Sequence, residues 1–360
     1  MSVIDVRSLD GASEHTVTDG QGYFPVIAAS ETDELLVVLR GGAAHMGLGG
    51  RLDAVRSADG GRKWSNPVTI ADSERDDRNP ALGFNRDGIA ILGYHWQGSY
   101  NDNGAWVSGK GPTDTRIVRS SDGGTTWNED LKLNWLPLNG TSPFGKIRRD
   151  DEGTLYMPVY GGSHPLGAGG DTPRFGPATC PTYLLRSNDD GDTWADPLTV
   201  AVGLNEADLL ILSANDWLFA ARSEDRNEQA IYTLRSTDRG HTWSSPVKVS
   251  DSQEHPPDLT LLSGGAVLMT YGRRHPTYGV EGRISLDRGQ TWLDHTLVIG
   301  NNLPGTDIGY PSTARLTDGT LITVYYSAGT DARPNEEYVA RDVSCIAVRY
   351  SETALLSAVS

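Results

Sequence analysis

The sequence predicts an all-β fold, a six-bladed β-propeller with four antiparallel strands in each blade. Two interlocking repeats predict it. The first is a turn motif, Ser-x-Asp-x-Gly-x-Thr-Trp, and the second is a pair of apolar strands joined by a Gly/Asp turn. Repeats that each supply four short strands are typical of propellers. The 42 glycines and 9 tryptophans among 360 residues agree with short strands and tight turns.

The turn motif occurs five times. Its Ser and Asp side chains can accept hydrogen bonds from backbone N–H groups inside a hairpin turn, and its Gly supplies a positive φ. Its Trp opens the next strand, where it can pack against the turn or the adjoining blade. We therefore expect the motif aspartates to be structural rather than catalytic. The copies begin at Ser57, Ser120, Ser187, Ser236 and Ser285, the first with Lys63 in place of Thr.

The strand pair occurs six times, and each of the first five copies precedes one turn motif. Each unit thus holds two hairpins, and six units predict one propeller domain over residues 1–360. The sixth unit lacks the motif, so we expect its outer strand within 338–351 and the N-terminal segment 2–8 to close the ring. The six pairs span 24–40, 79–96, 142–161, 205–222, 256–274 and 309–326.

Composition and charge disfavour several classes of partner. The net charge of −16 disfavours nucleic acid and anionic membranes, because both attract a basic surface. The sequence has no apolar stretch of about 18 residues and no secretory signal pattern, so we expect no membrane partner and a cytoplasmic location, with secretion left open as the alternative. Neither the two cysteines nor the eight histidines show a metal-ligand spacing, so we expect no metal and no other cofactor.

The strand order predicts where a ligand site lies. In each unit the first strand is innermost and the second returns antiparallel to it, so the start of the first lies beside the end of the second. Six such positions surround one axis, on the face opposite the turn motifs. Carboxylates, arginines and tyrosines recur there. They include Tyr23, Phe24, Arg40, Asp76, Asp77, Arg78, Asn79, Tyr94, His95, Phe144, Lys146, Tyr160, Glu206, Asp208, Arg222, Asp258, Arg273, Arg274, Asp307, Tyr310, Tyr325 and Tyr326.

On these motifs the chain resembles the sialidase (neuraminidase) superfamily, specifically bacterial proteins with Asp-box (BNR) repeats. The resemblance covers essentially the whole length. Asp boxes are specific for the fold class and only weakly specific for activity. The resemblance implies a carbohydrate-active hydrolase that binds a glycan or small sugar. It also implies a tyrosine nucleophile, a glutamate that activates it, an aspartate acid/base, and three arginines that bind the substrate carboxylate.

Four residues match that pattern well. The segment GYPS places Tyr310 at the nucleophile. Glu206 opens the innermost strand of the fourth unit and Arg222 closes the next strand, as the activating glutamate and second arginine would. Arg274, rather than Arg273, resembles the third arginine. A free tyrosine, with a pKa of about 10, is a poor nucleophile, so it needs a base such as Glu206. We expect the arginines to lower the pKa of Tyr310.

The acid/base aspartate implied by the resemblance falls in the loop after the first Asp box. Asp77 is our first choice for it and Asp76 the second. The strand ends named above would together form the mouth of the central channel. Among the other residues there, we expect Tyr94, His95 and Asp258 to contribute to substrate binding.

One element of the family pattern is missing. Sialidases carry their first arginine in an Arg-x-Pro segment, whereas this chain has Gly-Tyr-Phe-Pro at 22–25. Arg78, Arg40 or Arg51 could take its place, although the spacing does not require any of them to do so. A glycosidase for another sugar or for a uronic acid is therefore at least as well supported as a sialidase.

Two other functions stay open. A polysaccharide lyase on this scaffold would use His or Tyr as a base and Arg to neutralise a uronate, a role for which His95 beside Tyr94 and Trp96 is suited. A non-catalytic glycan-binding propeller would explain the missing arginine. Histidines in or near the predicted mouth loops are His45, His95, His164, His255 and His275.

Overall fold

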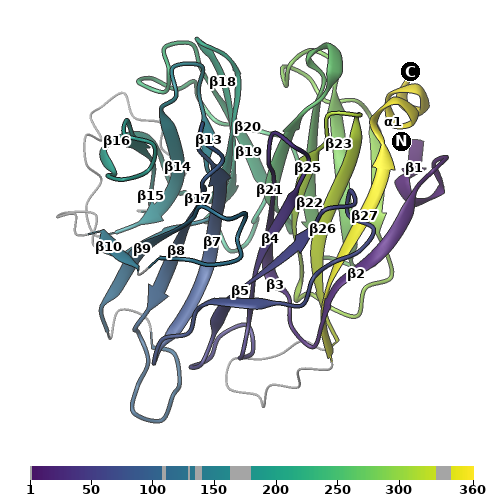
Figure 1. The fold of residues 1–360 in the computed structure, drawn as a ribbon. Coiled ribbons are helices and arrows are strands. Elements are labelled where there is room, and N and C mark those ends of the chain that lie inside the picture. The colour runs from purple at the N-terminus through teal and green to yellow at the C-terminus, as the bar shows by residue number, and fades with distance from the viewer. Residues whose placement is uncertain (1, 108–110, 129, 134–139, 163–179, 330–341) are drawn as a thin grey trace.

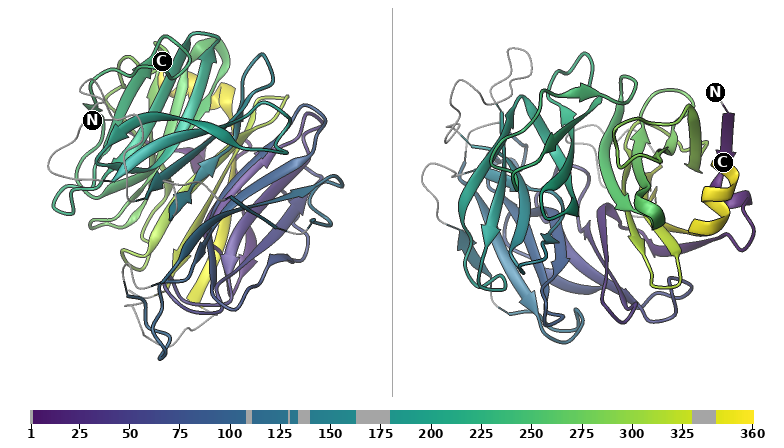
Figure 2. Two further views of the ribbon diagram at one scale, coloured as in Figure 1. Left: turned by 90° about the vertical axis from the view of Figure 1, so that its left-hand side faces the viewer. Right: turned by 90° about the horizontal axis from the view of Figure 1, so that it is seen from above.

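The computed structural model describes residues 2–107, 111–128, 130–133, 140–162, 180–329 and 342–360. Over this part of the chain the fold is a ring of six antiparallel sheets, which confirms the predicted six-bladed propeller (Figures 1 and 2). The described residues contain one α-helix, α1 (Glu352–Val359), whose N-terminus is capped by the hydroxyl of Ser351.

Each blade runs from an innermost strand outward. Blade one is β3 (Tyr23–Ala29), β4 (Leu35–Gly41), β5 (Arg51–Ser57) and β6 (Val68–Ala71). Blade two is β7 (Asp76–Phe84), β8 (Ala90–Gln97), β9 (Thr113–Ser120) and β10 (Leu131–Leu133). Blade three begins with β11 (Thr141–Pro143) and β13 (Arg148–Arg149), followed by β14 (Leu155–Gly161), β15 (Pro181–Ser187) and β16 (Ala195–Val202). Between β11 and β13, the short strand β12 (Gly145–Lys146) pairs parallel with β7 of blade two.

The remaining three blades follow the same order. Blade four is β17 (Leu204–Ser213), β18 (Asp216–Ser223), β19 (Ile231–Ser236) and β20 (Val247–Lys248). Blade five is β21 (Glu254–Leu261), β22 (Val267–Arg273), β23 (Gly279–Ser285) and β24 (His295–Gly300). Blade six is β25 (Ile308–Arg315), β26 (Thr320–Ala328), β27 (Val343–Ser351) and β2 (Ser13–Asp19).

The prediction for ring closure is wrong in its choice of segment. The strand that completes blade six is β2, which pairs antiparallel with β27, so Val343–Ser351 forms the third strand rather than the outer one. Within 2–8, strand β1 (Ser2–Asp5) instead adds to blade five, parallel to β24. In Figure 1 the purple β2 runs beside the yellow β27, and the two termini lie near each other.

The Asp-box turns have the predicted structural role. In the fourth copy the hydroxyl of Ser236 accepts a hydrogen bond from the N–H of Gly240 at 2.8 Å, and a carboxylate oxygen of Asp238 accepts the N–H of Thr242 at 2.8 Å. Gly240 has a φ of +82°, a backbone conformation that glycine adopts without steric strain because it has no Cβ. The indole N–H of Trp243 donates to the carbonyl of Gly240 and closes the turn.

The innermost strands share a bulge at the end opposite these turns. In β3, β7, β17, β21 and β25 the pairing with the next strand skips one or two residues near the start of the strand. The skipped residues Phe24, Asn79 and Tyr310 have φ of 53°, 52° and 47°, and each precedes a proline. A bulge re-aims the side chain that it carries. We call the end of the central channel where these bulges gather the mouth.

Candidate active site

Tyr310 and Glu206 meet at the mouth, although 104 residues separate them in the chain. The hydroxyl of Tyr310 donates a hydrogen bond to one carboxylate oxygen of Glu206. The other oxygen pairs with Nη1 of Arg222 at 2.5 Å. Tyr310 and Glu206 are buried, and Arg222 keeps 19% of its side chain exposed. The structure thus places three of the residues predicted from the sequence in one hydrogen-bonded row.

Arg274 lies across the ring of Tyr310, with its guanidinium carbon 5.1 Å from the ring centre. Its Nη2 donates to the carbonyl of Ile308 at 2.8 Å. Arg273 instead pairs with Glu281 at 3.0 Å, so the choice of Arg274 over Arg273 agrees with the geometry. In the described part of the chain the buried Nε atoms of Arg274 and Arg222 have no hydrogen-bond partner, so each guanidinium keeps a donor that these residues do not satisfy.

The environment holds Tyr310 in its neutral form. Burial raises the pKa of Tyr310 well above its ordinary value, and the charge of Glu206 raises it further. Arg274 and Arg222 lower the pKa but do not offset burial, so the expected net lowering is not observed. The phenol therefore keeps its proton at neutral pH and donates it as a hydrogen bond to Glu206.

Aromatic rings surround Tyr310. Its ring centre lies 4.9 Å from that of Phe24, 5.1 Å from Phe144 and 5.9 Å from Tyr326. Tyr23, at the position of the missing arginine segment, packs on Phe24 and Tyr326. These rings exclude water from the Tyr310–Glu206 pair, which strengthens every electrostatic interaction within it.

Arg78 is the arginine that comes closest to replacing the missing one. Its guanidinium stacks on Phe24, 5.2 Å from the ring centre, and its Nη1 contacts Asp76 at 3.3 Å. Within the described residues its Nη2 has no hydrogen-bond partner, so it can bind an anion beside Tyr310. Arg51, the third candidate, instead pairs with Asp53 at 3.1 Å.

Arg40 differs from Arg78 because all five of its N–H donors are occupied. It binds Asp76 through Nε at 2.8 Å and Nη2 at 2.7 Å, and it donates to the carbonyls of Ala43, Ala44 and Gly47. A fully buried guanidinium with no donor left cannot bind substrate. Arg40 instead anchors the β4–β5 loop, residues 42–50.

The two candidate aspartates, Asp76 and Asp77, face different sides of β7. Asp76 lies on the same face as Arg78. One of its carboxylate oxygens binds Arg40, and the other binds Arg78 and the hydroxyl of Tyr100. Asp77 lies on the opposite face, where it accepts the N–H of Ser73 at 2.7 Å. Burial raises the pKa of Asp77. The described contacts bring neither carboxylate to Tyr310.

The other predicted binding residues lie at three different places. His95 pairs across the strands with Arg78, its Nδ1 contacts the carbonyl of Thr141 at 3.0 Å, and burial together with Arg78 lowers its pKa to about 4. Tyr94 points the other way, into the core between blades one and two. Asp258 lies further along the channel, paired with Lys146 at 2.6 Å.

Several mouth residues received no role in the sequence analysis. His255 is buried, and among the described residues neither ring nitrogen has a hydrogen-bond partner; burial, Arg274 and Arg222 lower its pKa. Nδ1 of His45 lies 2.7 Å from Asp307. The signal for the bulged set was present: Phe24, Asn79, His255 and Tyr310 each stand directly before a proline that lies within an innermost strand. His164 lies outside the described residues.

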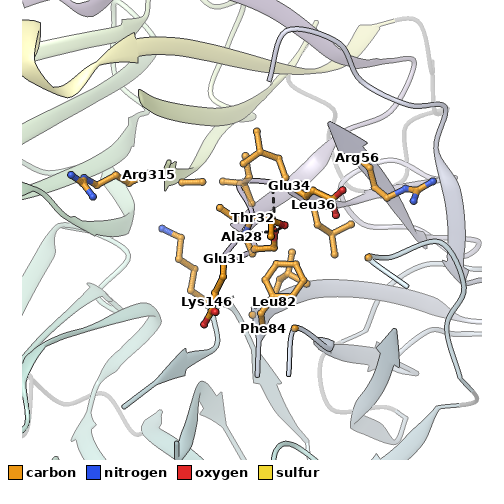
Figure 3. A pocket seen from close by; sticks show the side chains of 18 of the residues that line it. Ala28, Glu31, Thr32, Glu34, Leu36, Arg56, Leu82, Phe84, Lys146 and Arg315 are labelled. Atoms are coloured by element: carbon orange, nitrogen blue, oxygen red, sulfur yellow. Dashed lines mark hydrogen bonds between the residues drawn. The ribbon is translucent and has the colours of Figure 1, made fainter. Parts of the chain in front are cut away.

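The opposite end of the channel holds a cavity of about 1140 Å³ on the Asp-box face (Figure 3). Three basic groups at this end are paired with carboxylates. Lys146 binds Asp258, Arg148 binds Asp208 at 2.8 Å, and Arg315 binds Glu352 at 2.7 Å. These three charges are therefore neutralised without a ligand.

Two further features bear on cofactors and membranes. Among the described residues, no group of three or more His, Cys, Asp or Glu side chains is arranged to hold a metal ion. In the same part of the chain, no helix has the length and apolar character that crossing a membrane requires.

Comparison with known proteins places the chain in a family. Residues 32–324 match the model of the BNR repeat-like domain, so the protein belongs to that family, and its fold is sialidase-like. No curated protein matches the sequence.

Solved structures share the fold at low sequence identity. A Dyadobacter fermentans protein of unknown function has a TM-score of 0.74 and 19% identity, over 95% of this chain and 100% of that one. The NanB sialidase of Streptococcus pneumoniae has a TM-score of 0.69 and 12% identity, over 98% and 71%. Trypanosoma rangeli sialidase has a TM-score of 0.68 and 14% identity, over 99% and 61%. These similarities establish the fold and do not establish the activity, which has to be argued from the residues of the site.

Proposed function

We propose that the protein is a glycoside hydrolase for a sugar that carries a carboxylate, with Tyr310 as its nucleophile. One observation carries the proposal: the hydroxyl of Tyr310 donates to Glu206 in a buried mouth that three arginines flank. The shared fold with sialidases supports a hydrolase.

The chemistry follows from the contacts of Tyr310. In the first step its phenolic oxygen bonds to the anomeric carbon, its proton passes to Glu206, and the bond to the leaving oxygen breaks. In the second step water attacks the anomeric carbon and releases a proton, which balances the proton that the leaving oxygen takes up, and Tyr310 leaves and recovers its own proton from Glu206. Because burial raises the pKa of Tyr310, the nucleophile stays neutral until the reaction and does not repel an anionic sugar.

The arginines define the class of substrate. Within the described residues, the buried Nε donors of Arg222 and Arg274 have no hydrogen-bond partner, and the hydrogen bonds of Arg78 use Nε and Nη1 and leave Nη2 without one. Planar guanidinium groups bind a carboxylate with two parallel hydrogen bonds. Since Tyr23 and Phe24 replace the family's first arginine segment, the carboxylate would be bound differently from that of sialic acid. A uronic acid glycoside fits this arrangement better.

The direct test is turnover of aryl glycosides by wild type, Tyr310→Phe and Glu206→Gln. The panel contains sialic acid, glucuronic acid, galacturonic acid and neutral sugars. We expect hydrolysis of a uronic acid glycoside, weak or absent sialidase activity, and a loss of at least about 100-fold in kcat for each variant. Unchanged rates in both variants would remove this mechanism, and circular dichroism checks that each variant is folded.

A polysaccharide lyase is the second candidate, and His255 is the observation that favours it. Its imidazole is neutral at pH 7 because burial, Arg274 and Arg222 lower its pKa, and neither ring nitrogen has a protein partner. A neutral base beside two arginines could remove the proton next to a uronate carboxyl group. A lyase forms an unsaturated product that absorbs ultraviolet light and consumes no water, whereas the hydrolase incorporates oxygen from labelled water.

A further inference from the structure

Hydrolysis of an unactivated glycoside also requires a group that protonates the leaving oxygen. Neither predicted aspartate supplies one. Both carboxylate oxygens of Asp76 are already bound by Arg40, Arg78 and Tyr100. Asp77 is completely buried on the other face of β7. The described part of the mouth, however, holds a histidine–carboxylate pair.

That pair joins the loops of two neighbouring blades. Nδ1 of His45, in the β4–β5 loop, lies 2.7 Å from Oδ1 of Asp307, which directly precedes β25. The same oxygen accepts the hydroxyl of Tyr326 at 2.6 Å. Burial alone raises the pKa of Asp307, but His45, Tyr326 and Arg274 together hold it below its ordinary value. The carboxylate is therefore ionised and accepts the Nδ1–H of His45.

The other nitrogen of His45 is available for chemistry. Within the described residues Nε2 has no hydrogen-bond partner, and 27% of the side chain is exposed. A carboxylate that accepts Nδ1–H fixes the ring orientation and stabilises the charged imidazolium, which leaves Nε2 to donate or accept a proton. This is the arrangement of a general acid/base rather than of a buried structural histidine.

His45 lies on the wall of the mouth that Tyr310 also contacts. The ring of Phe24 packs against both His45 and Tyr310, with 4.9 Å between ring centres in both cases. Tyr23 contacts the edge of His45 at 5.9 Å. The loop does not depend on His45 for its conformation, because Arg40 holds the carbonyls of Ala43, Ala44 and Gly47.

We propose that His45 is the general acid/base of the reaction, with Asp307 and Arg40 as positioning residues. This inference rests on the proposed function. In the first step Nε2–H of His45 protonates the leaving oxygen while Tyr310 bonds to the anomeric carbon and Glu206 takes the phenolic proton. In the second step Nε2 accepts a proton from the attacking water, and Tyr310 recovers its own proton from Glu206. Each group ends the cycle in its starting form.

The test uses leaving groups of different basicity. Wild type, His45→Gln and Asp307→Asn are compared on aryl uronides that release dinitrophenol, which needs no protonation, or phenol, which does. His241→Gln, on an exposed Asp-box turn, is the matched control. For His45→Gln we expect kcat/KM on the phenyl uronide to fall about 100-fold or more, and on the dinitrophenyl uronide less than about 10-fold. Asp307→Asn should show the same pattern more weakly.

Outcomes separate this inference from the proposed function. If wild type hydrolyses no glycoside of the panel, the proposed function fails. If wild type is active and His45→Gln loses the same factor on both leaving groups, or loses nothing, His45 is not the acid and the proposed function stands. Nitrogen-15 NMR of the histidines adds a readout without turnover. We expect neutral His45 to carry its proton on Nδ1, and a proton on Nε2 instead would overturn the proposal.

Discussion

The residues of the mouth differ in how many of their hydrogen-bonding groups the protein itself satisfies. Arg40 uses every donor on Asp76 and backbone carbonyls, whereas Arg222 and Arg274 keep buried donors without partners. A buried polar atom without a partner costs stability, so its retention points to a ligand that completes it. Ranking the arginines by open donors thus separates structural from binding roles.

The binding arginines should therefore discriminate between anionic and neutral sugars. We predict that Arg274→Ala and Arg78→Ala raise KM for a uronide about 10- to 100-fold, because a charge-assisted hydrogen bond contributes about 1.5–3 kcal/mol. The matched neutral glycoside should change much less. Steady-state kinetics on the two substrates is the measurement, and equal losses on both would contradict an anion-binding role.

Arg40 should affect folding as well as activity. Arg40→Met leaves Asp76 buried without its main partner, so we predict a loss of about 3–5 kcal/mol in the free energy of unfolding. Urea denaturation at pH 7 measures it, with Arg62→Met, an exposed arginine, as the control. A loss below about 1 kcal/mol would show that the pair does not anchor the β4–β5 loop.

At the scale of the elements, the Asp-box turn and the bulge at the start of the innermost strand lie at opposite ends of the blade and have different roles. The turn satisfies its own backbone N–H groups and stabilises the outer hairpin, while the bulge re-aims a side chain at the start of five innermost strands. The sequence pattern predicts both ends of the blade because each repeats. Prolines after Phe24, Asn79, His255 and Tyr310 mark four of the five bulges.

The turns should contribute stability that depends on pH. Burial alone raises the pKa of Asp238, but hydrogen bonds from Thr242 outweigh it and hold the pKa below the ordinary value. A lowered pKa in the folded state stabilises the fold above the unfolded value of about 3.9, and this contribution is lost as pH falls through the folded pKa. We predict that Asp238→Ala costs about 1–2 kcal/mol at pH 7 and less at pH 3. Urea unfolding at both values measures this, and an equal cost would contradict it.

For the site, alternation along a strand explains what sequence alone could and could not predict. Glu206, Arg222, Arg274 and Tyr310 were predicted correctly as neighbours because each occupies a repeat-equivalent strand end. To place Asp77, one must know on which face of the strand its side chain lies as well as its position along the strand. A shift of one residue moves a side chain to the other face of the sheet. The catalytic roles of Glu206, Arg222, Arg274 and Tyr310 stay predictions.

His45 and Asp307 were both predicted in or near the mouth, but their pairing could not be predicted, for a different reason. They lie 262 residues apart, in loops without strand periodicity, so no repeat relates them. The same holds for ring closure, because 2–8 and 13–19 both form short strands and neither carries an Asp box. Only the three-dimensional pairing of β2 with β27 distinguishes them.

At the scale of the whole molecule, the propeller depends on joining its ends. Strand β2 covers the edge of β27 along seven residues, whereas β1 only extends blade five and leaves Val3 65% exposed. We predict that deleting residues 2–5 lowers the melting temperature by only a few degrees, while deleting 2–19 causes aggregation through the exposed strand edge. Size-exclusion chromatography and thermal melting compare the two truncations. A monomeric, cooperatively melting 2–19 deletion would contradict closure by β2.

The central claim is that Tyr310 forms a covalent bond to the sugar with Glu206 as its base. Mass spectrometry of the peptide that carries Tyr310, after incubation with a fluorinated glycosyl fluoride of the preferred sugar, tests this most directly. We predict one glycosyl adduct on Tyr310, formed much more slowly in Glu206→Gln. An adduct on Glu206 itself, or continued turnover with Tyr310 unmodified, would contradict it.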